Sequence, residues 1–318
     1  MTVLEAPLMK TMQTPKVTTS LVLASLLTAC GGGGGDSGEQ PPVVALSSTS
    51  SVKYSETMLI TLTGSRLDQT LTLTSAGCRN FVRGTTAPNI SSASTAYYTC
   101  TVAGGVGNQT VTVVASGATL ATVAFTVPVP QVSMVLGNGA GVAGTLVFTL
   151  SPEAAPLTVD NFLVYVKAGF YSGVAFHRHG RFENLGTFVL QTGGYAAPLT
   201  SGAVFPAHKA VNAPIVLEVN RGLSNRKYTL TMARTNLPDS ATSEFFINTA
   251  DNAFLDTSGG GYAVFGSVTT NTALVDAMVA APCNLSPVNF NSSTPLVAPS
   301  VDCLPEPNLV ISNALQTR

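Results

Sequence analysis

Charged side chains are scarce in this sequence, and their scarcity excludes several classes of protein. Asp, Glu, Lys and Arg make up 10% of the 318 residues, against about 25% in an average soluble protein. The 15 basic and 16 acidic residues leave a formal net charge of −1. This balance excludes a nucleic-acid-binding protein, because a row of phosphates would stay unneutralised. It also excludes a polybasic membrane-surface protein and a long charged tail.

Tryptophan is absent and only 3 His occur, so a His-rich metal site is not expected. What the sequence does have is apolar, small and β-branched. Hydrophobic residues make up 45%, and Ser, Thr, Gly and Val are plentiful. This mixture is typical of an exported protein that is rich in β-strands. The length allows about two domains at roughly 150 residues each.

The first thirty residues have the pattern of an export signal. Lys10 and Lys16 supply positive charge, and residues 17–29 form an uncharged, mostly apolar stretch. That stretch is too short to span about 30 Å of hydrocarbon as a helix. The small residues Thr28 and Ala29 directly before Cys30 resemble the lipobox of bacterial lipoproteins. The resemblance implies that residues 1–29 are a signal peptide and that Cys30 is lipidated; an ordinary secretory signal is the alternative.

Residues 30–42 are predicted to form a flexible Gly-rich tether between this anchor and the rest of the chain. Gly31 follows Cys30, at the position where many lipoproteins retained at the inner membrane carry Asp. We therefore expect a protein of the cell envelope that faces the periplasm at the outer membrane. Its partner there is the lipid bilayer, which it contacts through the Cys30 anchor.

Four cysteines remain once Cys30 is assigned to the lipid, and four cysteines allow three pairings. We expect the neighbours in sequence to pair, Cys78 with Cys100 and Cys283 with Cys303, because the periplasm is oxidising. Each bridge would close a loop of about 20 residues and stabilise the fold by roughly 3 kcal/mol. The alternative of a metal site is disfavoured, because no Cys-x-x-Cys pair occurs and no His is near either pair in sequence.

Residues 43–130 are predicted to form a small β-sandwich, which resembles immunoglobulin-like domains in its general pattern. Short runs rich in β-branched residues alternate with Gly, Asn and Ser clusters. The expected strands are residues 58–63, 71–74, 97–102, 109–115 and 122–127. The region contains no His and no catalytic spacing of charges, which favours a spacer or adhesive module over an enzyme. Two prolines, Pro128 and Pro130, mark its boundary.

The glycines at 139, 141 and 144 match the spacing of a dinucleotide-binding fingerprint. That fingerprint needs a helix next, with its N-terminus facing the pyrophosphate. The run that follows, residues 145–150, is strand-forming, so we expect a hairpin loop and no dinucleotide cofactor.

Residues 131–318 are predicted to form a second domain of mixed composition. Thr158 is placed to cap a helix that runs to Lys167, with apolar residues at i, i+3, i+4 and i+7. A second short helix is expected over residues 272–279. Strands are expected over residues 174–178, 187–191, 228–233, 244–249 and 262–268. Two helices against many strands predict a β-barrel with helices packed at its ends.

Seven ordered blocks in this domain resemble the cyclophilin-type peptidyl-prolyl isomerases, especially their bacterial periplasmic branch. The blocks are residues 144–150 with 155–162, 169–178, 188–194, 230–235, 239–248, 251–256 and 261–266. The resemblance implies a mainly β fold, an eight-stranded β-barrel closed by two helices. It also implies an enzyme that needs no metal and no cofactor.

The chemistry of such an enzyme suits a positioned arginine and an apolar pocket. Rotation about an Xaa-Pro bond meets a barrier of about 18–20 kcal/mol, because the nitrogen lone pair is delocalised into the carbonyl. A donor aimed at the prolyl nitrogen holds that lone pair and favours the twisted amide. Arginine suits this task because it stays charged and carries rigid donors.

By resemblance, Arg178 is the catalytic arginine. Phe188, Val189, Phe246 and Leu255 line the proline pocket, whereas Gln191 and Ala233 hold the substrate backbone with Arg234 beside them. Phe254 stands where many eukaryotic members have Trp, and Tyr262 where they have His. Judged singly, each apolar residue could equally be an ordinary core residue. His177 is expected to pack behind the site, and His179 and His208 are expected at the surface.

Three departures from the family pattern concern rate and substrate range. Glu244 replaces the family's Gln, and we expect its carboxylate to pair with Arg178, either orienting it or withdrawing it. Residues 179–187 replace a shorter turn and form a rim contact or a loop. Val189 replaces the usual Met and leaves the pocket less filled.

Two functions follow from these residues. The first is a lipid-anchored isomerase that accelerates Xaa-Pro rotation in proline-containing segments of exported proteins and so assists their folding. The alternative is a cyclophilin-like module that binds proline-containing peptides with little turnover, which Glu244 and the altered loop would favour.

Overall fold

A computed structural model describes residues 40–50, 52–182, 186–200, 206–284 and 302–318 of the chain. The signal peptide, Cys30 and nearly all of the tether that the sequence predicts lie outside the described residues. The described part forms 18 β-strands, two α-helices and two short 3-10 helices. None of its helices is both long enough and apolar enough to cross a membrane.

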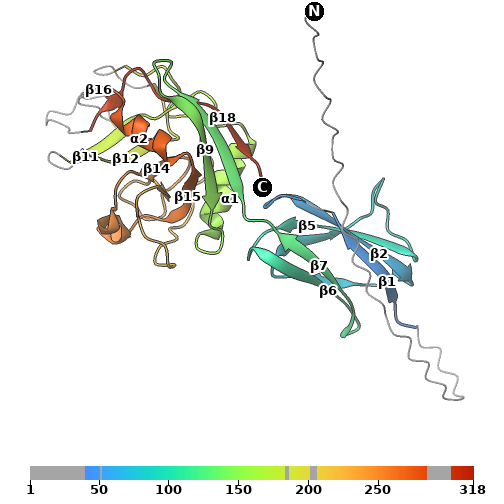
Figure 1. The fold of residues 1–318 in the computed structure, drawn as a ribbon. Helices are drawn as coiled ribbons and strands as arrows, with labels where there is room; N and C mark the ends of the chain where they lie inside the picture. The colour runs from blue at the N-terminus through green and yellow to red at the C-terminus, as the bar shows by residue number, and fades with distance from the viewer. Residues whose placement is uncertain (1–39, 51, 183–185, 201–205, 285–301) are drawn as a thin grey trace, which may run out of the picture.

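Residues 43–127, which we call the N-terminal β region, are built from two antiparallel sheets (Figure 1). Their orders are β1-β2-β5-β4 and β3-β6-β7. The strands are β1 (Val43–Thr49), β2 (Thr57–Ser65), β3 (Thr72–Thr74), β4 (Cys78–Arg83), β5 (Thr95–Val102), β6 (Gly107–Ala115) and β7 (Ala118–Val127). In β5 every second residue is buried, because successive side chains of a strand point to opposite faces. This alternation explains why the strands were visible in the sequence.

The predicted Cys78–Cys100 disulfide is present and joins two strands that are already paired. Cys78 begins β4 and Cys100 lies in β5, with their Cα atoms 5.8 Å apart. Both side chains are buried in the apolar core. The bridge therefore fastens one sheet internally.

Residues 131–318, which we call the C-terminal region, contain a curled sheet of nine strands in the order β10-β18-β8-β9-β15-β13-β14-β12-β11. These are β8 (Gln131–Gly137), β9 (Ala143–Leu150), β10 (Val174–Ala175), β11 (Arg178–Phe182), β12 (Gly186–Thr192), β13 (Thr229–Met232), β14 (Phe245–Asn248), β15 (Val264–Thr270) and β18 (Val310–Gln316). The 3-10 helices η1 (Ala253–Asp256) and η2 (Ser258–Gly260) lie between β14 and β15.

The two outermost strands of this sheet, β10 and β11, are joined by only two residues, Phe176 and His177. The backbone N–H of Phe176 donates to the Leu309 oxygen and that of His177 to the Gln191 oxygen. One nearly continuous stretch therefore supplies both outer strands. The described residues thus form a mainly β fold with a curled nine-stranded sheet and two α-helices, where the sequence predicted an eight-stranded barrel closed by two helices.

Helix α1 (Pro156–Lys167) packs on this sheet with the apolar face that the sequence predicted. Val159, Phe162, Leu163 and Val166 are buried. The predicted cap was wrong, because the helix begins at Pro156 and Thr158 lies inside its first turn. The backbone N–H and hydroxyl of Thr158 donate to the buried carboxylate of Glu218, at 2.8 and 2.9 Å. A distant carboxylate thus satisfies the helix N-terminus in place of a local cap.

The second helix, α2 (Thr272–Ala280), buries Leu274, Val275 and Met278 as predicted. The glycines at 139 and 141 lie in the hairpin turn between β8 and β9, with φ values of 69° and 102°. Both need the left-handed conformation that glycine adopts without strain. The hairpin explains the spacing that mimics a dinucleotide fingerprint.

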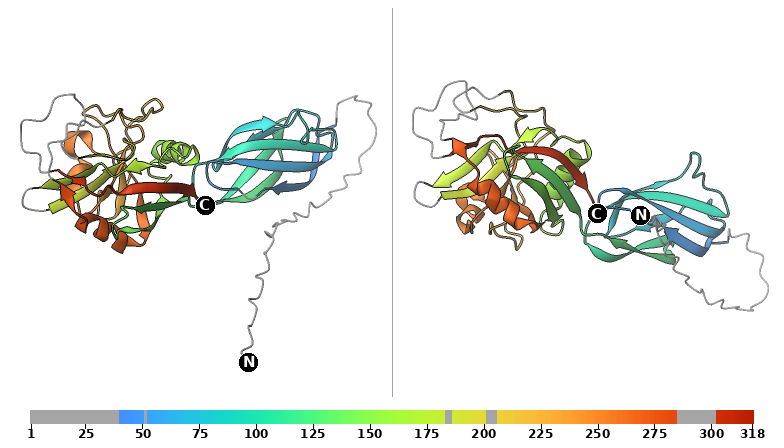
Figure 2. Two further views of the ribbon diagram at one scale, coloured as in Figure 1. Left: turned by 90° about the horizontal axis from the view of Figure 1, so that it is seen from above. Right: turned by 45° about the horizontal axis from the view of Figure 1, so that its top comes forward.

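The two regions meet where α1 and the C-terminal strand reach the N-terminal β region (Figures 1 and 2). The amide of Gln316 in β18 donates to the Tyr54 oxygen at 2.8 Å. The ammonium group of Lys167 in α1 donates to the Ser55 oxygen at 2.7 Å. One continuous apolar core runs through both regions. The short linker around Pro128 and Pro130 therefore connects two parts that also touch side by side.

Candidate active site

Three neighbouring strands bring together residues that the sequence separates. Strand β12 lies between β11 and β14. Arg178 of β11 is opposite Gln191 of β12, and Gln191 is opposite Phe246 of β14. Directly opposed residues of an antiparallel sheet share a face. A guanidinium, an amide and an aromatic ring thus form one row across the sheet.

A small apolar cluster, separate from the main core, adjoins this row. It consists of Val189, Ala233, Phe246 and Leu255, with Phe188 and Tyr262 packed against it. All six are residues that the sequence assigned to substrate. Phe254 lies at the edge of this cluster, 44% exposed, with its ring 6.0 Å from that of Phe188. The structure therefore gathers the residues expected around a proline ring.

The 3-10 helix η1 is held against the cluster by an amide. The Asn252 side chain donates to the Phe188 oxygen at 2.7 Å and to the Asn248 side chain at 2.8 Å. These bonds fix Phe254 and Leu255, which follow Asn252, against the end of β12. Because the bonds are buried or half-buried, they hold η1 in one place.

Arg234 lies beside Ala233 and packs against Tyr262. Its guanidinium lies 4.4 Å from the centre of the Tyr262 ring and donates to the Gly259 and Gly261 oxygens. These contacts orient Tyr262 at the cluster. Arg234 thus supports the wall beside Ala233.

The guanidinium of Arg178 is held at two of its nitrogens. Its Nε donates to the Asp302 carboxylate at 2.6 Å, and Nη1 donates to the Gln191 side-chain oxygen at 2.9 Å. The side chain is 28% exposed. Within the described residues Nη2 makes no hydrogen bond. Arg178 is therefore fixed in its plane while it keeps donors for a substrate.

The carboxylate of Glu244 does not pair with Arg178, contrary to the expectation from the sequence. It accepts a hydrogen bond from the Gln191 amide at 2.7 Å and lies 2.8 Å from His208 Nε2 and 3.4 Å from His177 Nε2. Gln191 stands between the two charges, because its amide nitrogen faces Glu244 and its oxygen faces Arg178. Glu244 thus orients Gln191, and Asp302 is the carboxylate on Arg178.

The contacts around Glu244 shift the pKa of its carboxyl and the pKa of His208. Burial alone would raise the pKa of Glu244, but the charge and hydrogen bond of His177, together with the bonds from His208 and Gln191, lower it below its usual value. The hydrogen bond to Glu244 raises the pKa of His208, against the effect of burial. The result is a carboxylate that stays ionised and a histidine that binds its proton more tightly.

His177 lies behind the site, where the sequence placed it, fully buried with its ring 5.0 Å from that of Tyr195. His179, which was expected at the surface, is fully buried. Burial, with the nearby charge of Arg181, lowers the pKa of His179 to about 4. That prediction was wrong because His179 is covered by Cys303, a residue that is remote in the sequence.

The predicted Cys283–Cys303 disulfide is also present, with Cα atoms 5.5 Å apart. It links β16 (Cys283–Asn284) to Cys303, the residue before β17 (Leu304–Pro305), and Cys303 forms an isolated bridge with His179 of β11. One ring nitrogen of His179 and the two sulfurs lie within 4.8 Å of one another. His179 is thus a neighbour of this cysteine pair in space, which the sequence spacing did not reveal. Both sulfurs are used in the disulfide, so they do not serve as thiolate ligands for a metal.

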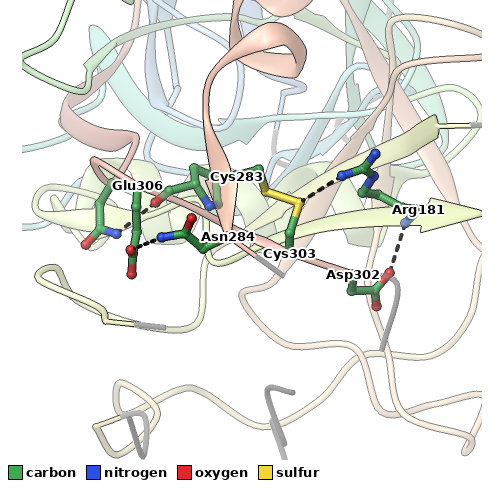
Figure 3. Close-up of a disulfide and its surroundings, with 8 residues drawn as sticks. Arg181, Cys283, Asn284, Asp302, Cys303 and Glu306 are labelled. Atoms are coloured by element: carbon green, nitrogen blue, oxygen red, sulfur yellow. Dashed lines mark hydrogen bonds between the residues drawn. A yellow bond between two sulfur atoms is a disulfide. The ribbon is translucent and has the colours of Figure 1, made fainter. Parts of the chain in front are cut away.

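The segment expected as a rim loop is mostly a continued hairpin. Strand β11 runs to Phe182 and pairs with β12 across a bulge between Gly180 and Arg181. Figure 3 shows Arg181 between the disulfide and Asp302, donating its backbone N–H to Asp302 at 2.9 Å. Residues 183–185, which include Glu183, lie outside the described residues.

Comparisons with known proteins agree with this geometry. Residues 133–293 match the family described as "Cyclophilin type peptidyl-prolyl cis-trans isomerase/CLD". The chain therefore belongs to the cyclophilin-type peptidyl-prolyl cis-trans isomerases, a family of enzymes.

Particular relatives are bacterial. The chain is 45% identical to "Peptidyl-prolyl cis-trans isomerase cyp18" of Streptomyces antibioticus over 141 residues. This aligned stretch covers 43% of this chain and 78% of that protein. It is 40% identical to "Peptidyl-prolyl cis-trans isomerase A" of Dickeya dadantii over 161 residues. This aligned stretch covers 50% of this chain and 78% of that protein. A solved Cryptosporidium parvum cyclophilin matches with a TM-score of 0.41 and 18% identity, over 59% of this chain and 98% of that one.

Sequence reasoning missed Asp302 and the contact of His208 with Glu244. Asp302 is 124 residues from Arg178, and its only local signal is that it precedes Cys303, a cysteine expected to form a bridge. His208 lies in an irregular segment with no period that would place it. Both contacts arise from the way the chain returns to β11 and β12.

Proposed function

We propose that this chain is a peptidyl-prolyl cis-trans isomerase that accelerates rotation about Xaa-Pro bonds, with Arg178 as the catalytic residue. The observation that carries the proposal is the placement of the Arg178 guanidinium in the same row as Gln191 and Phe246, beside a separate apolar cluster. A charged donor next to an apolar pocket is the combination that the reaction needs. Membership of the isomerase family supports it.

In this proposal the apolar cluster holds the proline ring while the guanidinium faces the prolyl nitrogen. Phe246 and Leu255 exclude water from the ring, which strengthens an electrostatic interaction there. As the amide twists, its nitrogen lone pair becomes localised and accepts a hydrogen bond from Arg178. This bond is strongest in the twisted state, so it lowers the barrier and does not merely bind the substrate.

The direct test is the exchange rate of an Xaa-Pro peptide, measured by NMR with and without the protein. Arg178→Ala is expected to lower kcat/KM by about 10²- to 10³-fold, the loss typical when a preorganised donor is removed. Arg66→Ala, which removes a cation in the N-terminal β region, serves as the matched control and is expected to be fully active. Equal rates for the wild type and Arg178→Ala would contradict the proposal.

The alternative function, a binding module with little turnover, is motivated by Glu244 and by the altered loop of residues 179–187. Glu244 bonds Gln191 and His208 and does not pair with Arg178, which leaves Arg178 beside the pocket. Glu244→Gln, which restores the family residue, discriminates between the two. Brisk turnover that the substitution leaves unchanged supports the isomerase, whereas a large increase supports the binding module.

We also propose that the substrates are proline-containing segments of exported proteins and that Cys30 anchors the chain to a bilayer. The pattern of residues 1–30 and the two disulfides support this proposal, because disulfides persist in oxidising compartments. The N-terminal β region is then an immunoglobulin-like sandwich that acts as a spacer between the outer membrane and the isomerase in the periplasm.

Fractionation of cells that produce the full chain tests the anchor. The wild type is expected in the detergent-soluble membrane fraction and labelled by radioactive palmitate. Cys30→Ser is expected to lose the label. An unlabelled wild-type chain in the soluble fraction would overturn the anchor and leave the isomerase proposal untouched.

A further inference from the structure

The segment that begins at Asp302 returns to the catalytic strand from far along the chain. Cys303 and His179 exchange two backbone hydrogen bonds, of 2.8 and 3.1 Å. The next two residues pair, as β17, with β16 at the end of α2. The Cys283–Cys303 disulfide joins Cys283 of β16 covalently to Cys303, the residue before β17 (Figure 3). Two backbone bonds therefore place this segment against β11, and one covalent bond ties it to β16.

The Asp302 carboxylate uses both of its oxygens on β11. One accepts the Nε hydrogen of Arg178 at 2.6 Å, and the other accepts the backbone N–H of Arg181 at 2.9 Å. Gln191 holds the same guanidinium at Nη1, on a different nitrogen. Two contacts at separate nitrogens fix the plane of a guanidinium, because the group is rigid. Without Asp302 only the Gln191 contact would remain, and the group could rotate about it.

We propose that Asp302 is a positioning residue for the catalytic arginine and that the Cys283–Cys303 disulfide keeps it in place. The inference rests on the proposed isomerase function of Arg178. It makes isomerase activity depend on the oxidation state of a bond outside the apolar cluster. The strands β16 and β17 have two residues each, so the disulfide is the one covalent fastening beside a short backbone pairing.

The disulfide lies in surroundings that favour its opening by a dithiol. Nη1 of Arg181 is 3.7 Å from the Cys303 sulfur, and a nearby guanidinium stabilises a thiolate. Cys303 is buried, whereas Cys283 is only partly buried. A thiolate of the dithiol is therefore expected to attack the Cys283 sulfur, and the Cys303 sulfur leaves as a thiolate beside Arg181.

The second thiol of the dithiol then displaces the Cys283 sulfur. The dithiol ends as a cyclic disulfide, and two electrons and two protons have passed to the two cysteines. Asp302 is then held next to β11 only by the backbone hydrogen bonds of Cys303 and by the short β16–β17 pairing, and we expect it to leave Arg178 more readily.

The experiment compares Asp302→Ala, Asp302→Asn and the wild type in the oxidised full chain. A misplaced guanidinium acts mainly on the barrier, so Asp302→Ala is expected to lower kcat by about tenfold while KM is unchanged. Asp302→Asn keeps an oxygen that accepts from Nε and is expected to retain most of the activity. Asp276→Ala, which removes an aspartate paired with Lys227, is the matched control and is expected to be fully active.

The disulfide is tested by dithiothreitol in a Cys78→Ser/Cys100→Ser chain, where Cys283–Cys303 is the sole bridge open to reduction. Reduction is expected to lower kcat as Asp302→Ala does. A Cys283→Ser/Cys303→Ser chain is expected to start at that low rate and to ignore dithiothreitol. Activity that reduction leaves unchanged, or Asp302→Ala with wild-type kcat, would overturn the inference.

A second measurement does not depend on turnover. The NMR signal of the Arg178 Nε–H group, assigned by its loss in Arg178→Lys, is expected to exchange slowly with water in the oxidised wild type and rapidly after reduction or in Asp302→Ala. Rapid exchange in the oxidised wild type would contradict the positioning role. If the wild type had no isomerase activity, the proposed function would fail. The exchange rate of the Arg178 Nε–H signal would still decide whether Asp302 holds Arg178.

Discussion

The two disulfides of this protein are the same chemical bond used in two different settings. Cys78–Cys100 lies in the core of the N-terminal β region, between strands that are already paired. Cys283–Cys303 joins two-residue strands next to the site, with Arg181 at one sulfur and Asp302 as the preceding residue. The first bond adds stability to a sheet that would exist without it. The second determines where a carboxylate lies relative to Arg178.

The largest effect that tests this contrast comes from the core of the C-terminal region. Phe162→Ala removes a fully buried ring of α1 that contacts Tyr171, Phe245 and Phe265. It is expected to lower the free energy of unfolding by about 3–5 kcal/mol. Guanidinium denaturation measures it, and Phe254→Ala, at an exposed ring, is the matched control. A loss below about 1 kcal/mol would contradict the packing described for α1.

Removal of the first disulfide is the next largest effect. Cys78→Ser/Cys100→Ser is expected to lower the free energy of unfolding of the N-terminal β region by about 3 kcal/mol, because the unfolded chain gains freedom. Isomerase kcat is expected to stay at the wild-type value. Denaturation followed by tyrosine fluorescence, with the exchange assay on the same sample, checks both statements. A fall in kcat would erase the contrast between the two bridges.

The pair of Glu244 and His208 predicts a smaller, pH-dependent effect. The pKa of His208 is raised above 6.5 in the folded chain, so its stabilisation is fully present below pH 6.5 and is lost as pH rises through the raised pKa. The loss is expected to be at most about 1 kcal/mol after solvent screening. Urea titrations from pH 5.5 to pH 8.5 measure it. His208→Ala is expected to flatten this profile, and an unaltered profile in the variant would exclude the pair as its cause.

The ion pair between the two regions is expected to contribute least. Arg79 Nη2 lies 2.5 Å from Asp160 of α1, but the arginine side chain is 46% exposed. Exposed ion pairs contribute about 0–1 kcal/mol. Arg79→Ala is therefore expected to shift the midpoint of thermal unfolding only slightly. Gln316→Ala, which breaks the buried bond to the Tyr54 oxygen, is expected to shift it more. The reverse order would show that the contact between the regions is mainly electrostatic.

Local periodicity predicted the elements of this protein well. The strand around Tyr98 and the helix around Phe162 both follow from alternating or helical spacing of apolar residues. The members of the apolar cluster followed from the resemblance to the isomerase family. Three contacts could not be predicted in this way: the burial of His179, the capping role of Glu218 and the contact of Asp302 with Arg178. Each of them joins residues that are far apart in the sequence. Side-chain periodicity reports only on local structure and carries no information about such long-range contacts.

The junction at Phe176 and His177 has a consequence for the edges of the curled sheet. Exposed sheet edges are where extended peptides add a strand and where aggregation begins. Here the two outer strands of the curled sheet are consecutive in the chain, and isolated bridges to Ala196 and Cys303 cover part of each. An extended peptide therefore meets little unpaired backbone at these two strands, as far as the described residues show. Addition of a strand to this sheet is disfavoured there, and the apolar cluster remains the place where a proline-containing peptide can bind.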